Sequence, residues 1–172
     1  NVSIADLLSL VSIDSGEMRL KREKFRLDDM VRDCARKLAP LARERGIELE
    51  ETVRDAVEIT ADKSKLMQVV YNVIDNAIKY TPRAGSVHVD MARAGKRAVI
   101  RISDTGIGIP EEDQKHIFDR FYRVDKSHSK ASGGTGLGLS IVKHAVQYHH
   151  GRIELESTPG TGTTIRVVFP NP

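Results

Sequence analysis

The spacing of the apolar residues predicts helices in four parts of the chain. Apolar side chains recur every three or four positions, as on one face of an amphipathic helix, over 1–16, 28–45, 62–80 and 136–150. An Asp that follows a short strand within "REKFRLDD" supplies a cap for the second helix, and Asp62 caps the third. Pro40 lies inside the second helix and should kink or split it.

Short stretches rich in β-branched residues predict strands between these helices. They lie within 22–29 and at 47–52, 57–60, 86–94, 97–104, 152–157 and 163–169. A Gly-Lys turn joins the two strands at 86–94 and 97–104, which is a hairpin signal, and "PGTG" joins the last two. Helices interspersed with hairpins indicate an α+β fold in which a mixed sheet lies under helices.

Composition narrows the classes of protein. The chain has 172 residues, enough for one globular domain, and its net charge of +3 comes from 27 basic and 24 acidic residues that are interleaved. No basic tail is present and aromatic residues make up only 5%, so we expect no nucleic-acid partner. The single cysteine, Cys34, is predicted to be a small core residue. No stretch is long and apolar enough to span a membrane, so we expect a soluble chain without membrane contact.

Polar residues line one flank of the predicted helix at 62–80. Gln68, Asn72, Asn76 and Lys79 follow at steps of four, four and three, beside an apolar stripe. Asn is a poor helix former, so its presence twice in this helix needs a reason. Asn72 and Asn76 are either tolerated surface residues or functional ones. The functional interpretation is Mg²⁺ bound by an amide oxygen, since Mg²⁺ takes few protein ligands and completes its shell with water and phosphate oxygens.

Asp104 ends the strand at 97–104 with the same parity as the apolar residues Ala98, Ile100 and Ile102. Its carboxylate therefore points to the buried side and needs a donor. One alternative is a backbone partner in an Asp-Thr-Gly turn. The other is an amine of a ligand, with Gly106 and Gly108 letting that ligand approach the main chain closely.

The stretch "SGGTGLGLS" at 132–140 leads from a loop into the last helix, where free backbone N–H groups favour anions. It lacks the lysine of a Walker loop and the spacing of a dinucleotide fingerprint, and a hinge or linker is the alternative. Upstream, "IFDRFYRVDKSHSK" at 117–130 is either a helix that plugs the core or a lid that brings an arginine to a polyphosphate.

In their order and spacing these motifs resemble the catalytic ATP-binding domain of bacterial sensor histidine kinases. "NVIDNAIKYTP" is similar to the Asn box of that family, "DTGIGIP" to its first glycine box and "IFDRFYRVD" to its Phe box. "GGTGLGLSIVK" resembles the second glycine box and "GTGTTIRVVFP" the closing Gly-Thr strand. The resemblance covers roughly 25–170 and implies a two-layer α/β sandwich of the Bergerat type, with ATP under a mobile lid at about 106–136.

The resemblance also implies roles for individual residues. Asn76 would ligate Mg²⁺ with Asn72 beside it, and Lys79 and Arg123 would contact phosphates. Tyr80 would lie by the nucleotide, Asp104 would accept a hydrogen bond from the adenine amino group, and Thr163 would help close the base pocket. The residues expected along the bound nucleotide are Gly106 and Gly108 at the base, and Gly134, Thr135, Gly136, Leu137 and Gly138 at the phosphates.

The residue type at the position of Asn72 distinguishes the histidine kinases from other members of this ATPase family. Gyrase-type ATPases and anti-sigma serine kinases carry a Glu general base at this position, and an amide cannot take a proton near neutral pH. A full kinase also has a phosphoacceptor His near Glu, Arg, Thr and Pro, and none of the six histidines has such neighbours. Residues 1–18 resemble the end of the dimerisation hairpin and its linker, and 19–172 the catalytic domain.

We therefore expect a fragment that binds Mg-ATP but cannot phosphorylate itself. Its partners would be the phosphoacceptor domain of a homodimeric parent and a response regulator. The domain would be cytoplasmic, in a parent anchored in the inner membrane. The main alternative is a non-catalytic nucleotide-binding module that regulates a partner by lid closure. A DNA-binding domain is a third, which the interleaved charges disfavour.

Overall fold

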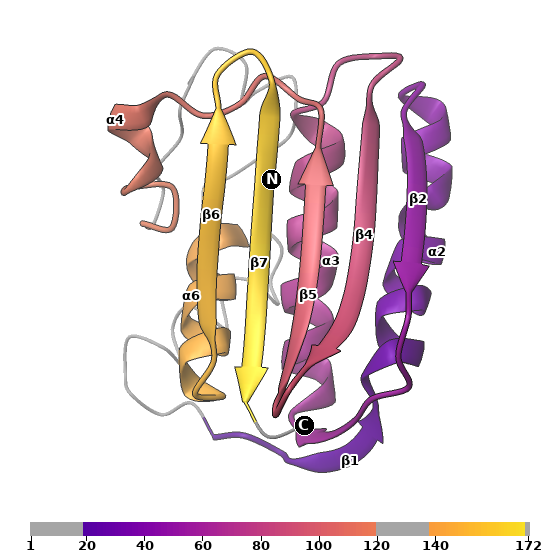
Figure 1. The fold of residues 1–172 in the computed structure, drawn as a ribbon, viewed down its shortest axis with the longest axis vertical. Coiled ribbons are helices and arrows are strands. Elements are labelled where there is room, and N and C mark those ends of the chain that lie inside the picture. Colours follow the sequence, from indigo (N-terminus) through magenta and orange to yellow (C-terminus); the bar gives the residue numbers. More distant parts are fainter. Residues whose placement is uncertain (1–18, 120–137, 171–172) are drawn as a thin grey trace.

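The computed structural model describes residues 19–119 and 138–170. Three helices, α2 (Leu27–Glu44), α3 (Lys63–Lys79) and α6 (Gly138–Tyr148), cover one face of a five-stranded sheet (Figure 1). The sheet has the order β2-β4-β5-β7-β6, in which β2 and β4 are parallel and the other pairs antiparallel. Its strands are β2 (Glu48–Val53), β4 (Ser86–Ala94), β5 (Arg97–Asp104), β6 (Arg152–Thr158) and β7 (Gly162–Pro170). The predicted α+β sandwich with a mixed, mostly antiparallel sheet is confirmed.

A small second sheet lies at one end of the molecule, where β1 (Glu23–Arg26) pairs with β3 (Glu58–Ala61) (Figure 1). The remaining described helix is the short α4 (Glu111–Gln114). It lies in a stretch that we expected to be a polar, glycine-bearing lid. The predicted bounds of β4 and β5 are confirmed, and Gly95 in the turn between them has a φ of 61°, as such hairpin turns require.

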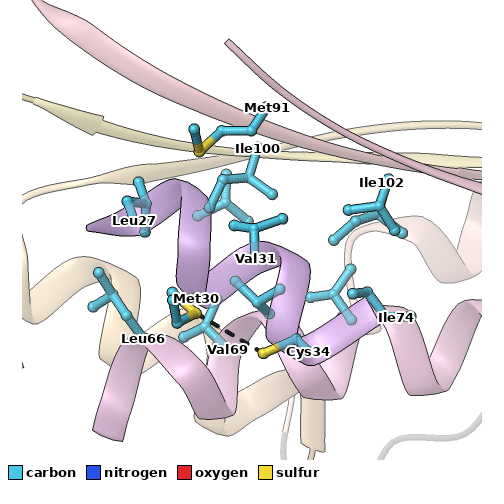
Figure 2. Close-up of a cluster of buried hydrophobic side chains, with 14 of the residues drawn as sticks. Leu27, Met30, Val31, Cys34, Leu66, Val69, Ile74, Met91, Ile100 and Ile102 are labelled. Carbon is cyan, nitrogen blue, oxygen red and sulfur yellow. Dashed lines mark hydrogen bonds between the residues drawn. The ribbon is translucent and has the colours of Figure 1, made fainter. Parts of the chain in front are cut away.

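The core lies between the sheet and the helices. Alternate residues of β5, Ala98, Ile100 and Ile102, are buried and face the helices, as the parity of the strand predicts. Figure 2 shows Val31 of α2 near Ile100 of the sheet, and Cys34 beside Val69 of α3. Cys34 donates to the sulfur of Met30 over 3.9 Å, and burial raises the pKa of its thiol to about 11. Cys34 is therefore the core residue that we predicted, and not a reactive one.

The start of α2 differs from the prediction. The N-cap is Arg26, which makes no capping hydrogen bond through its side chain, and the helix begins at Leu27. The buried Asp28 instead accepts a hydrogen bond from the backbone N–H of Val57 over 3.1 Å and pairs with Arg26 and Arg32. The carboxylate thus binds the start of α2 to the segment that precedes β3. The helix also runs on without a break through Pro40, so the predicted split does not occur.

The N-terminus of α3 meets the C-terminus of α6. Asp62 caps α3 as predicted, accepting from the N–H of Lys65 over 3.2 Å. The N–H of Asp62 donates to Nε2 of His149 over 3.1 Å, while Nδ1 of this buried ring lies 2.8 Å from the carbonyl oxygen of Ala145. Because a carbonyl can only accept, Nδ1 carries the proton and the ring is neutral. Burial lowers the pKa of His149, which keeps this form.

Candidate functional site

The polar flank of α3 faces the start of α6. The apolar residues of α3 are buried, which fixes the rotation of the helix and leaves Asn72 and Asn76 half-buried beside the core. A Cβ atom added at Gly138 would lie 3.9 Å from Nδ2 of Asn72. That nitrogen is buried, and no hydrogen bond reaches it from the part of the chain that the structure describes. A buried amide N–H without a partner is costly. The side-chain amide of Asn72 therefore suits a ligand that accepts a hydrogen bond between α3 and α6.

Lys79 already has an acidic partner. Its Nζ lies 2.9 Å from Oδ2 of Asp75, one turn earlier on α3, and both side chains are largely buried. The sequence motif placed Lys79 among the predicted phosphate contacts but gave no role to Asp75. A phosphate that binds Lys79 therefore has to compete with the carboxylate of Asp75, or share the ammonium with it.

Asp104 lies at the end of β5 and uses only one of its two oxygens. Oδ1 accepts from the N–H of Gly106 over 2.8 Å and from the N–H of Thr163 over 3.1 Å. The backbone-partner alternative is therefore realised at Oδ1. Within 19–119 and 138–170 no hydrogen bond reaches Oδ2. Burial raises the pKa of Asp104, and the two N–H donors lower it only in part. The free oxygen is a half-buried acceptor that suits a ligand with an N–H group.

The two glycines after Asp104 pack against the protein's own backbone. A Cβ atom at Gly106 would be 2.5 Å from the carbonyl oxygen of Tyr80, which accepts from the N–H of Ile107 over 3.2 Å. Gly108 has a φ of 74°, and a Cβ atom there would overlap the carbonyl oxygen of Thr158. Internal packing thus already requires both glycines. It brings Tyr80, at the end of α3, beside the start of the segment that follows Asp104.

The structure therefore brings together Asp104, Gly106, Tyr80 and Thr163 at the ends of β5, α3 and β7. Asn72 and Gly138 form a second group, between α3 and α6. The other predicted contacts, Arg123, Gly134, Thr135, Gly136 and Leu137, lie outside the described residues. The described residues contain no cluster of His, Cys, Asp or Glu that could hold a metal ion. A metal here would need amide oxygens and ligand phosphates, which is the donor set that Asn76 and a nucleotide offer.

Sequence reasoning missed two side chains next to this site, Ser157 and Gln114. The hydroxyl of Ser157 accepts from the N–H of Ile109 over 2.8 Å, and Gln114 of α4 donates to the carbonyl oxygens of Ile109 and Ser157. Ser157 ends an alternating strand and Gln114 follows an acidic run, so neither has a local signal. The pairing of β6 with β7 brings Ser157 to the site, and the hydrogen bonds of Gln114 hold α4 against it.

A sheet covered on one face by helices, with a half-buried carboxylate at a strand end and asparagines on the facing helix, is the arrangement that the motifs predicted for an ATP-binding sandwich. The chain belongs to the family of histidine kinase-, DNA gyrase B- and HSP90-like ATPases, whose model matches residues 61–172. The parts of the chain that the structure describes contain no helix that is long and apolar enough to span a bilayer.

Its relatives include sensor histidine kinases. The chain is 39% identical to the non-motile and phage-resistance protein of Caulobacter vibrioides over 171 residues, and 38% identical over 170 residues to the circadian input-output histidine kinase CikA of Synechococcus elongatus. Each match covers 97% of this chain but only 20% and 22% of these relatives. The chain thus spans about a fifth of their length.

Solved structures of histidine kinases share the fold. Full-length ShkA in complex with AMPPNP superposes with a TM-score of 0.83 at 27% identity, covering 96% of this chain and 34% of ShkA. The mycobacterial sensor histidine kinase MprB superposes with a TM-score of 0.73 at 32% identity, covering 87% of this chain and 97% of the MprB chain. The described part of this chain therefore has the fold of a histidine kinase catalytic domain.

Proposed function

We propose that this chain binds Mg-ATP and positions its γ-phosphoryl group for transfer to a histidine on a separate dimerisation domain. The geometry of Asp104 carries the proposal. Oδ1 is held by two backbone N–H groups, which leaves Oδ2 free beside Gly106 to accept from the exocyclic amine of adenine. The complex of ShkA with AMPPNP, an ATP analogue, supports a nucleotide as the ligand.

The phosphates would then extend along α3 towards the start of α6. In this proposal Lys79 and Arg123 contact phosphate oxygens, and the backbone from Gly134 to Gly138 supplies N–H donors. Asn76 holds Mg²⁺ through its amide oxygen, with Asn72 beside it. The bound Mg²⁺ would offset the negative charge of the phosphates during transfer.

The amide at position 72 supports a kinase rather than a hydrolase. A side-chain amide cannot act as a base towards water, so ATP bound here would await an external nucleophile. We propose that 19–172 form the catalytic ATP-binding domain and 1–18 the end of a dimerisation-hairpin helix and its linker. The phosphorylated histidine would then serve a response regulator in the cytoplasm.

The test is phosphoryl transfer from γ-labelled ATP to a phosphoacceptor hairpin that is added as a separate polypeptide. We expect label on the hairpin histidine with the wild-type chain, and none on this chain alone. Asn76→Ala should abolish transfer at saturating ATP while leaving much of the nucleotide affinity. Ser64→Ala, exposed in the first turn of α3, is the control and should transfer normally. ATP binding without any transfer by the wild-type chain would instead favour a regulatory nucleotide-binding module.

A further inference from the structure

Ser157 joins three segments that meet at the site. Its hydroxyl oxygen lies 2.8 Å from the N–H of Ile109, 3.2 Å from the carbonyl oxygen of Gly162 and 2.8 Å from the hydroxyl oxygen of Thr163. Ser157 and Thr163 are paired across β6 and β7, and Thr163 is paired with Asp104 across β7 and β5. Because paired residues share a face, Asp104, Thr163 and Ser157 lie side by side on the helix-facing side of the sheet.

The number of protons fixes the direction of these hydrogen bonds. Ser157 has one hydroxyl proton, and the carbonyl oxygen of Gly162 can only accept it. All three contacts are therefore made together only if Thr163 donates its own proton to Ser157. Thr163 Oγ1 is then left with lone pairs alone. The free Oδ2 of Asp104 is an acceptor as well, so the two neighbouring groups both require donors from a ligand.

We propose that Ser157 is a positioning residue that sets base specificity, by orienting the Thr163 hydroxyl as an acceptor beside Asp104. This inference rests on the proposed binding of ATP at Asp104. A purine with an amino group at its sixth carbon can donate to this pair of acceptors. A purine with an oxo group there places an acceptor against them, and a buried mismatch of this kind is strongly rejected.

The experiment measures the affinities of Mg-ATP and Mg-ITP by calorimetry for the wild-type chain and for Ser157→Ala. Without Ser157, the Thr163 hydroxyl can rotate and donate to the oxo group of ITP. We expect the preference for ATP over ITP to fall about three- to tenfold, the effect of one hydrogen bond. Thr163→Val, which keeps the branched shape of the side chain, should lower the same preference. It tests the proposal even if Ser157→Ala does not fold.

Two control variants separate this role from general support of the fold. Ser103 and Thr164 form a similar hydroxyl pair at 3.0 Å on the opposite face of the sheet, and Ser103→Ala should leave both affinities unchanged. Gln114→Ala removes the bonds of α4 to Ile109 and Ser157 but leaves the Thr163 hydroxyl in place, so it should leave the preference unchanged. An unaltered preference in Ser157→Ala or folded Thr163→Val would overturn the inference. A wild-type chain that binds neither nucleotide would instead contradict the proposed function.

Discussion

Among single residues, Asp104 carries a cost in stability from the burial of its carboxylate, a cost that its proposed role in binding would explain. Because burial raises its pKa in the folded chain, folding favours the protonated form. The sign follows: stability is greatest below the ordinary pKa of Asp and falls as pH rises through the raised value. Asp104→Asn keeps an acceptor for the N–H groups of Gly106 and Thr163 and cannot ionise. We expect this variant to be more stable than the wild type at pH 7 and to lose that advantage at low pH, as measured by urea unfolding.

The same substitution should weaken ATP binding, because it places an amide nitrogen or a neutral oxygen where the carboxylate would accept from the base. The loss of a charged acceptor corresponds to about 1.5–3 kcal/mol, which calorimetry at pH 7 would detect. If Asp104→Asn binds ATP as tightly as the wild type, Asp104 does not contact the base. Higher stability combined with lower affinity is the result that a purely structural carboxylate would not produce.

Gly108 and Gly95 form a matched pair for testing the packing next to the site. Both have positive φ, 74° and 61°, but only Gly108 lies against another segment, at Thr158. Gly95→Ala should cost about 1–2 kcal/mol of unfolding free energy from backbone strain alone. Gly108→Ala should cost a further ~1–3 kcal/mol from overlap, with displacement of the β6–β7 turn. Equal losses in chemical denaturation would show that the contact at Gly108 is easily relieved.

At the scale of secondary-structure elements, His149 should make the contact between α3 and α6 sensitive to pH. Its pKa is lowered in the folded chain, so the unfolded chain binds the proton more readily and stability falls as pH drops from about 6.5 through the lowered value. A protonated ring has no acceptor for the N–H of Asp62, and the nearby Arg22 and His150 oppose its charge while Asp62 favours it. His149→Gln should reduce the pH dependence of unfolding between pH 7 and 5. If the free energy of unfolding of His149→Gln varies with pH as in the wild type, groups other than His149 cause that dependence.

Elements with a strong local pattern could be predicted closely, and those fixed by distant contacts could not. The bounds of β4 and β5 follow from alternation and a hairpin turn, and the cap at Asp62 from an Asp before an apolar helical repeat. The expected cap at the start of α2 fails because the carboxylate of Asp28 is used by Val57, 29 positions away. A cap is predicted from the few residues around it. The contact between Asp28 and Val57 therefore could not be foreseen from the residues near the start of α2.

Contacts between distant segments limit the prediction of the site as well. The motifs located Asp104 and Thr163, and the structure places them as neighbours on β5 and β7. The motifs also suggested that Gly106 and Gly108 let a ligand approach the main chain, which stays a prediction, and the structure shows that backbone atoms of the protein lie where a Cβ atom would stand at both positions. Ser157 was missed because its hydroxyl gains its role only where Ile109 and Thr163, from two other segments, meet it. Asp75 lies just one helical turn before Lys79, and the motif simply gave it no role.

At the scale of the whole molecule, Mg-ATP should stabilise the sandwich by linking its two layers, since the proposed site joins α3, β5, β7 and the start of α6. A ligand that binds only the folded state at a hundredfold excess over its dissociation constant adds about 2.7 kcal/mol to the free energy of unfolding. We expect urea midpoints to rise with Mg-ATP concentration, and to rise less without Mg²⁺ because Asn76 then has no metal to hold. Asn76→Ala should remove that difference between the two conditions while keeping a response to ATP. A magnesium effect that persists in Asn76→Ala would place the metal on other groups, and no response to nucleotide at all would contradict binding between the layers.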